Sequence, residues 1–177
     1  MTIAILALQG AFREHEEMLS RLGADWIELR ERKDLDRPYD GLILPGGESS
    51  VQGKLLKDLE LFAPLQRQIQ DGLPVLATCA GLILLAERLE NDNRHYFQTL
   101  PVTVRRNAYG RQLGSFSTLG EMQSVGTVPM RFIRAPAITE AAPDVSVLAE
   151  VNGTAVAVRW HNQLALAFHP ELHTDAR

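Results

Sequence analysis

The stretch Val75-Leu76-Ala77-Thr78-Cys79-Ala80-Gly81-Leu82 decides the fold class of this chain. It begins as a buried strand, and the apolar run that starts at Gly81 has the composition of a helix. The cysteine stands between them on a sharp turn flanked by small residues, which is the form of a nucleophile elbow. Because such a turn exposes its central side chain at the end of a strand, the sequence predicts a reactive role for Cys79.

The segments on both sides of this turn alternate between strand and helix patterns. We expect strands at 3–8, 26–29, 42–44 and 73–77 and helical segments at 15–22, 55–69 and 81–89. Nearly continuous apolar strands separated by helices are typical of a parallel sheet covered on both faces. The sequence therefore predicts a three-layer α/β fold with a mostly parallel central sheet.

The second half of the chain has a different pattern. Short β-rich segments occur at 102–105, 127–133, 145–151, 155–160 and 164–168. We expect them to extend the sheet with antiparallel strands. The polar segment 110–126 contains four glycines and is predicted to form a loop.

Composition limits the classes of protein that this chain can represent. With 177 residues, 45% hydrophobic and 23% charged, it suits one domain over residues 1–177. The net charge of −4 and the lack of a Lys or Arg run do not favour nucleic acid as a partner. A single cysteine excludes an intrachain disulfide, and the apolar start fits a first strand better than a signal peptide, so we expect a cytoplasmic protein. We expect no metal and no cofactor.

The tetrapeptide Phe168-His169-Pro170-Glu171 follows the last apolar segment and can supply a base. With Pro170 holding the backbone extended, His169 and Glu171 would project to the same side. The carboxylate could then fix the imidazole tautomer while the other ring nitrogen faces Cys79. Taken alone, the tripeptide is more often an ordinary turn. The remaining histidines lack comparable context: His15, His95, His161 and His173.

A glycine turn, Pro45-Gly46-Gly47-Glu48-Ser49-Ser50, follows the third expected strand. Its glycines allow close backbone approach to a ligand, which would suit an oxyanion site. An ordinary strand-to-helix turn with a serine cap is the alternative when the segment is considered alone. Likewise, an unpaired cysteine in an apolar segment is more often inert core packing.

Seven segments in order along the chain resemble a single family. They are Leu6-Ala7-Leu8-Gln9-Gly10-Ala11, Pro45-Gly46-Gly47-Glu48-Ser49, Thr78-Cys79-Ala80-Gly81, Arg106-Asn107, Gly110-Arg111-Gln112, Phe132-Ile133-Arg134-Ala135-Pro136 and His169-Pro170-Glu171-Leu172. They resemble the glutaminase subunit of pyridoxal 5'-phosphate synthase, the PdxT/SNO family of class I glutamine amidotransferases. The resemblance implies the flavodoxin-like fold of that class and hydrolysis of L-glutamine to L-glutamate and ammonia.

The same resemblance implies a role for individual residues. Cys79 would attack the carboxamide and form a thioester, His169 would transfer protons and Glu171 would orient the imidazole. The remaining implied sites are an oxyanion site at Gly46, Gly47 and Ala80, a glutamine site at Gly47, Glu48, Ser49, Arg106, Ile133 and Arg134, and an activation loop at Gln9 and Gly10. The implied partner is a PdxS/SNZ-like synthase subunit in a large hetero-oligomeric ring, which would receive the ammonia for vitamin B6 biosynthesis.

Three other interpretations stay open at the level of sequence. A DJ-1-like cysteine hydrolase or deglycase also uses a cysteine elbow, although no carboxylate lies in the preceding segment 72–78. A subunit of another biosynthetic amidotransferase would share the elbow but differ in its surrounding segments. A non-enzymatic assembly subunit would retain the fold, but the intact Cys79, His169 and Glu171 argue against it.

Overall fold

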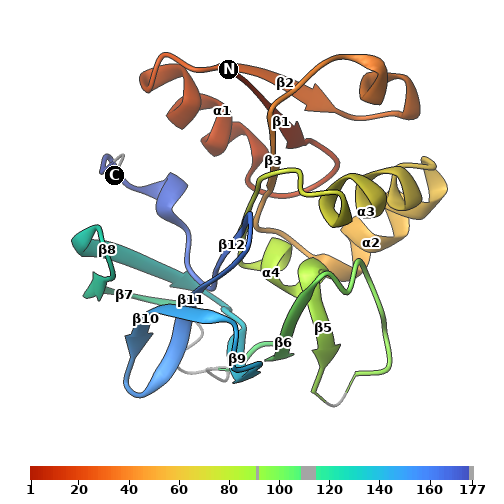
Figure 1. Ribbon diagram of the computed structural model, residues 1–177. Helices are drawn as coiled ribbons and strands as arrows, with labels where there is room; N and C mark the ends of the chain where they lie inside the picture. Colours follow the sequence, from red (N-terminus) through yellow and green to blue (C-terminus); the bar gives the residue numbers. More distant parts are fainter. Residues whose placement is uncertain (91, 109–114, 176–177) are drawn as a thin grey trace.

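A ten-stranded sheet runs through the centre of the molecule (Figure 1). The computed structural model describes residues 1–90, 92–108 and 115–175. The strand order is β2-β1-β3-β4-β12-β11-β9-β6-β5, with β10 paired to β11 beside this path. The strands from β2 to β12 in this order pair in parallel, whereas β11 and β9 pair with their neighbours antiparallel. The predicted antiparallel extension of a parallel sheet is therefore confirmed.

The strands are short, and those at the centre of the parallel part are largely buried. Their bounds are β1 Thr2–Leu6, β2 Asp25–Leu29, β3 Gly41–Leu44, β4 Val75–Thr78, β5 Ala86–Leu89, β6 Leu100–Arg105, β7 Ser115–Met122, β8 Gly126–Ile133, β9 Ala137–Ala141, β10 Ser146–Val151, β11 Thr154–Trp160 and β12 Gln163–Leu166. All four residues of β3 are buried, as expected for a strand with helices on both sides.

Helices cover both faces of the parallel part of the sheet. The α-helices are α1 Phe12–Arg21, α2 Ser49–Asp58, α3 Phe62–Gln70 and α4 Ala80–Leu85, and the 3-10 turns are η1 Arg32–Asp36 and η2 Pro170–Leu172. Helix α1 packs on β1 and β2 from one side, while α2, α3 and α4 lie on the other (Figure 1). The three-layer α/β architecture predicted from the alternating pattern is confirmed.

Parallel pairing brings the carboxyl ends of four strands to one edge of the sheet. The chain leaves β1 toward Gln9, β3 toward Gly46, β4 into Cys79 and β12 toward His169. The Cys79 N–H continues the pairing, since it donates to the Leu166 carbonyl at 2.8 Å. In an open α/β sheet, ligands bind beyond this edge. The fold thus gathers the segments that the sequence singled out.

The helix predicted over 81–89 is wrong in its second half. Helix α4 ends at Leu85, and 86–89 form strand β5, which pairs in parallel with β6. The carbonyl groups of Leu84 and Leu85 accept the N–H groups of Phe97 and Thr99, so a returning segment ends the helix. Tertiary pairing overrides the helical propensity of this leucine-rich stretch.

The loop predicted over 110–126 is wrong where the structure describes it. Residues 115–122 form β7, which pairs antiparallel with β8 in a separate two-stranded sheet, while 110–114 lie outside the described residues. Side chains of β7 alternate between exposed and half-buried. A strand with one exposed face can be polar in composition, which is why the sequence pattern was interpreted as a loop. The short strand β9 was also missed.

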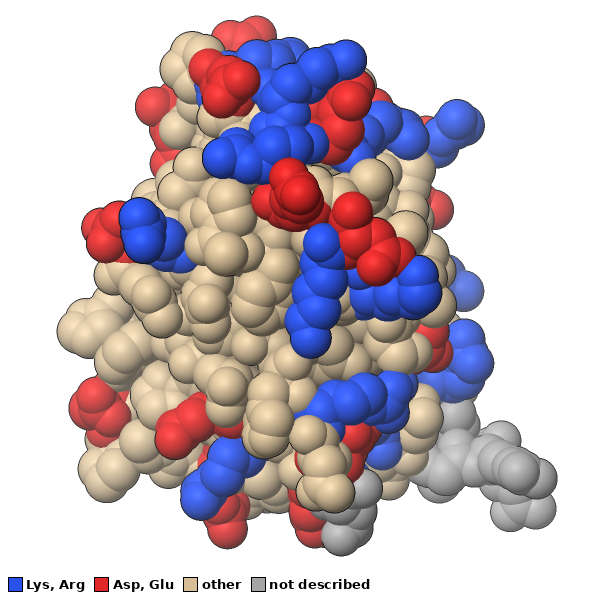
Figure 2. Space-filling view, turned by 90° about the vertical axis from the view of Figure 1, so that its right-hand side faces the viewer, with Lys and Arg blue, Asp and Glu red and all other residues tan. Residues whose placement is uncertain are grey.

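The surface carries charges of both signs. On the face shown in Figure 2, Lys and Arg side chains are interspersed with Asp and Glu. Such mixing gives no broad field for a polyanion. Among the described residues, none of the helices combines the length and apolar character that crossing a bilayer requires.

Gly81 permits the close contact between α4 and β3, which gives a test of the packing. A Cβ at Gly81 would lie 2.2 Å from the Leu44 carbonyl oxygen. We expect Gly81→Ala to lower the free energy of unfolding by about 1–3 kcal/mol, because backbone must shift to relieve the overlap. Chemical denaturation measures this change. Gly41→Ala is the control, since its Cβ would meet the rotatable Ile3 Cδ1 at 3.3 Å, and an equal loss in both variants would contradict the explanation.

Candidate active site

Cys79 occupies a strained backbone conformation between β4 and α4. Its φ of 47° and ψ of −98° lie in a region that residues with a side chain rarely adopt. This strain costs on the order of 1–3 kcal/mol and persists only where the surroundings enforce it. The residue caps the N-terminal end of α4, and its Sγ lies 3.9 Å from the Ile133 carbonyl oxygen. The elbow predicted from the sequence is present.

The His169 ring is held from behind by Glu171. The distance from His169 Nδ1 to Glu171 Oε1 is 2.6 Å, and both side chains are buried. The His169 N–H donates to the Arg131 carbonyl at 2.9 Å, which anchors the backbone. The expected pair is therefore formed. Its predicted basis is wrong, however, because Pro170–Leu172 make a 3-10 turn instead of an extended segment.

The environment of His169 favours the protonated ring. Burial lowers the pKa of His169, but hydrogen bonds with Cys79 and Glu171, together with the charges of both partners, outweigh burial and raise the pKa to about 10. With this raised pKa, the His169 ring favours the imidazolium form at neutral pH. A cysteine beside an imidazolium and a helix N-terminus is in the setting of reactive thiolates.

The turn after β3 packs directly against this ring. A Cβ on Gly46 would lie 2.3 Å from His169 Cε1, so only glycine fits there. The Gly46 N–H donates to Thr78 Oγ1 at 3.0 Å, and the Gly46 carbonyl accepts the Ala11 N–H at 2.9 Å. Of the three amides expected to form an oxyanion site, that of Gly46 is therefore already engaged. Gly47 and Ala80 remain the candidate donors.

A cavity of about 210 Å³ opens beside Cys79. It is lined by Gln9, Ala11, Gly46, Gly47, Glu48, Ser49, Cys79, Ile83, Arg106, Asn107, Ile133, Arg134 and His169. All residues of the expected glutamine site line it. Glu171 and Ala80 do not line the cavity, and Gly10 lies behind the turn, where its Cβ would be 1.9 Å from the Gly46 carbonyl oxygen.

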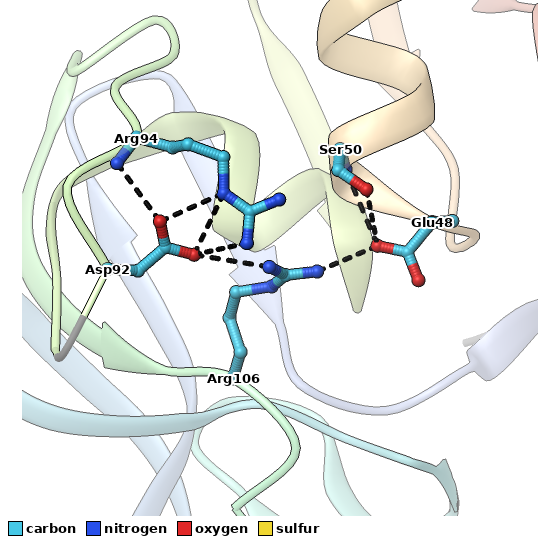
Figure 3. Close-up of polar contacts among 5 residues, drawn as sticks. All are labelled: Glu48, Ser50, Asp92, Arg94 and Arg106. Atoms are coloured by element: carbon cyan, nitrogen blue, oxygen red, sulfur yellow. Dashed lines mark hydrogen bonds and ion pairs between the residues drawn. The ribbon is translucent and has the colours of Figure 1, made fainter.

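Charged side chains form a network at the rim of the cavity (Figure 3). Arg106 donates to Glu48 Oε1 at 2.7 Å and to Asp92 Oδ2 at 3.1 Å. Asp92 also accepts from Arg94, and the hydrogen bonds from Arg94, followed by that from Arg106, lower the pKa of Asp92. Glu48 in turn accepts the Ser50 N–H and hydroxyl. The network fixes the Arg106 guanidinium beside the site.

The Gln9 segment is fastened to the glycine turn. Gln9 Oε1 accepts the Glu48 N–H at 2.7 Å, and Gln52 Nε2 donates to the Gln9 carbonyl at 2.8 Å and to the Pro45 carbonyl at 3.1 Å. These hydrogen bonds link the position of Gln9 to the Glu48 amide and to the Pro45 carbonyl. The segment predicted to form an activation loop thus lies against the glycine turn.

A family model for the SNO glutamine amidotransferase family matches residues 5–177. The chain belongs to this family. It is 59% identical over 177 residues to a pyridoxal 5'-phosphate synthase subunit PdxT of Desulfitobacterium hafniense, covering 100% of this chain and 89% of that protein. It is 54% identical over 175 residues to a subunit of the same name from Methanocorpusculum labreanum, covering 99% and 92%. The resemblance found in the sequence is confirmed.

A solved structure agrees with the membership in the SNO glutamine amidotransferase family. A crystal structure of a glutamine amidotransferase matches with a TM-score of 0.93 and 39% identity, covering 98% of this chain and 93% of the other. The likeness thus extends over nearly the whole fold, including the strands whose ends form the cavity.

Sequence reasoning missed several residues around the site in this family member. Thr78 holds the Gly46 amide, and Asp92 and Arg94 hold Arg106. His15, set aside for lack of context, lies against Glu171. Its place on the apolar face of the first helix was a usable signal, because a histidine there is carried toward the sheet. No comparable signal marks Asp92 or Arg94.

The raised pKa of His169 predicts a pH dependence of stability. The pKa rises from 6.5 to about 10 on folding, so the native state binds this proton more tightly. The stabilisation is complete below pH 6.5 and is lost as the pH rises through 10. We expect the difference in unfolding free energy between wild type and His169→Gln to shrink between these limits. Denaturation at pH 6, 8 and 10 measures it, and a constant difference would contradict the assignment.

Proposed function

We propose that this chain is the glutaminase subunit of a pyridoxal 5'-phosphate synthase, hydrolysing L-glutamine to L-glutamate and ammonia. The observation that carries the proposal is the convergence of Cys79, on its strained elbow, with the buried His169–Glu171 pair beside one cavity. A nucleophile, a base and an orienting carboxylate are the three parts of a nucleophilic triad. The names of the relatives support glutamine as the substrate.

The first step is attack of the Cys79 thiolate on the carboxamide carbon of glutamine. The carbonyl oxygen becomes an oxyanion that the N–H groups of Gly47 and Ala80 would receive. The His169 imidazolium gives its proton to the amide nitrogen, the C–N bond breaks and ammonia leaves. The product on the enzyme is a γ-glutamyl thioester. Losing one oxyanion donor typically costs about 2.7–4 kcal/mol of barrier.

The second step is hydrolysis of this thioester. His169 is now neutral and takes a proton from water as the oxygen attacks the acyl carbon. The C–S bond breaks, the thiolate returns and glutamate leaves. Glu171 stabilises the imidazolium in both steps through its 2.6 Å contact with Nδ1.

The cavity suits a single amino acid with charged ends. Its volume of about 210 Å³ is small for a ligand site. Arg106 and Arg134 supply positive charge for the α-carboxylate, and Glu48 supplies negative charge for the α-ammonium. The backbone of Gly47, Ser49 and Ile133 would complete the glutamine site.

The partner would be a PdxS/SNZ-like synthase subunit assembled in a large ring. Ammonia that escapes into water becomes ammonium and loses its nucleophilicity. A direct passage between the subunits would deliver ammonia to the synthase before it is protonated. Docking near Gln9 and Gly10 would adjust the Gly47–Glu48 backbone through the contacts already described. We therefore expect weak glutaminase activity in the isolated chain.

Glutamate release from glutamine, with and without the cognate synthase subunit, tests this function. We expect Cys79→Ala to abolish release and His169→Asn to lower it at least about 1,000-fold, since triad members act as a unit. His161→Asn is the matched control, because His161 lies in the turn between β11 and β12, beyond the opposite end of β12 from His169. Undiminished turnover in Cys79→Ala would eliminate the mechanism, and a wild type inactive even with the synthase would eliminate the function.

Substitution of two adjacent arginines, Arg105 and Arg106, tests how glutamine is recognised. Arg106→Ala should raise KM for glutamine about tenfold or more with a smaller effect on kcat, because a charged contact to bound substrate is lost. Arg105→Ala is the control, since Arg105 pairs with Glu90 on an exposed surface. Steady-state kinetics on both variants measures KM and kcat separately. Equal KM values would remove Arg106 from the glutamine site.

A further inference from the structure

His15 is a buried histidine that the proposed reaction does not use. It lies on α1 with 3% of its surface exposed. Its Nε2 is 3.7 Å from Glu171 Oε2 and 3.3 Å from Thr78 Oγ1. These two oxygens belong to the carboxylate behind His169 and to the hydroxyl that holds the Gly46 amide. One ring therefore contacts both the carboxylate that orients His169 and the hydroxyl that binds the Gly46 amide.

Glu171 needs a second polar contact. Its Oε1 faces His169, whereas the buried Oε2 has no hydrogen-bond partner within 3.5 Å among the described residues. Much of the surrounding space is apolar: a cavity of about 290 Å³ beside Glu171 is lined largely by side chains such as Leu19, Leu166 and Phe168. A buried carboxylate oxygen without a donor is costly. The His15 Nε2 is the ring nitrogen placed to reduce that cost.

The charge state of His15 suits the role of a neutral donor. Burial lowers the pKa of His15, Glu171 raises it, His169 lowers it and Glu14 raises it, with a net lowering. A neutral imidazole carries one hydrogen, and only on Nε2 does it face Glu171 and Thr78. The Thr78 hydroxyl oxygen has two lone pairs, so it can accept from both His15 and Gly46.

We infer that His15 is a positioning residue of the glutaminase, whose Nε2–H donates to Thr78 Oγ1 at 3.3 Å and presents its positive end to Glu171 Oε2 at 3.7 Å, so that one ring keeps both groups in place. This inference rests on the proposed function, because it assigns His15 to the same triad. With Oε2 held, Oε1 stays directed at His169 Nδ1. With Thr78 held, the Gly46 amide and the following Gly47 amide keep their orientation beside Cys79.

Three substitutions at His15 distinguish the effect of the Nε2–H donor from the effect of side-chain volume. His15→Gln places an amide N–H near the former Nε2, His15→Asn is polar but too short to reach, and His15→Leu fills space without a donor. We expect kcat to fall about 10- to 100-fold in His15→Leu and His15→Asn, with KM within about threefold, because misplacement of the triad affects the chemical step. His15→Gln should recover most of the activity.

The pH profile of thiol alkylation gives a readout that a purely structural role would not move. Cys79 is the only cysteine, so iodoacetamide reports its thiolate alone. In His15→Leu and His15→Asn we expect the rise of the alkylation rate to move up by about one pH unit, since a displaced Glu171 supports the His169 imidazolium less well. Gln163→Leu is the control: Gln163 is equally buried but bonds Thr99, at the other end of β12.

The outcomes separate the inference from the function on which it rests. A folded His15→Leu or His15→Asn with wild-type kcat and alkylation profile would overturn the role of His15 while Cys79→Ala remains inactive. If His15→Leu does not fold, the comparison of His15→Asn with His15→Gln decides, and equal behaviour of those two would overturn it. If the wild-type protein shows no glutaminase activity, the proposed function is wrong. The alkylation profile would then still test whether His15 positions Glu171 beside His169.

Discussion

The parallel pairing of β4 with β3 and β12 is the constraint on which the site depends. Backbone hydrogen bonds set the register, with Ala77 opposite both Leu44 and Ala165. From that register the next residues along each strand arrive at one edge: the glycine turn, the elbow and His169. A shift of one residue in either ladder would reverse the side of every following side chain. The main-chain register therefore sets which segments meet at the site.

Close packing behind this edge requires glycine at two positions. A Cβ on Gly46 would collide with the His169 ring, and one on Gly81 would collide with the Leu44 carbonyl. Both glycines bring main chain to within contact distance of a group that the site needs in place. The strained backbone of Cys79 is tolerated because β4 on one side and the buried helix α4 on the other leave it no freedom.

Buried charge is balanced within the site. Glu171 lies between His169 and His15, and the two rings differ in their protonation: the pKa of His169 is raised and that of His15 is lowered. The difference follows from position, since burial at His169 is outweighed by hydrogen bonds with Cys79 and Glu171, whereas burial outweighs the charge of Glu171 at His15. At the rim, Arg106 bridges Glu48 and Asp92, so the positive charge that would meet substrate is held by two carboxylates.

The sequence by itself determined the alternation of strands and helices, the elbow at Cys79, the glycine turn and the His169–Glu171 pair. The first three features depend on local composition and periodicity, which a single chain displays. The pair was identified from its residues together with the family resemblance, and the 3-10 turn that brings its two side chains together was not predicted. Only the tertiary structure decided that α4 stops at Leu85, that 115–122 is a strand, that the Gly46 amide is taken by Thr78 and that His15 stands behind Glu171. Each of these depends on a partner outside the segment itself: the neighbouring strand β8 for 115–122, and more distant groups for the end of α4, the Gly46 amide and His15. Local spacing along the sequence carries no information about which group arrives to accept or donate a hydrogen bond.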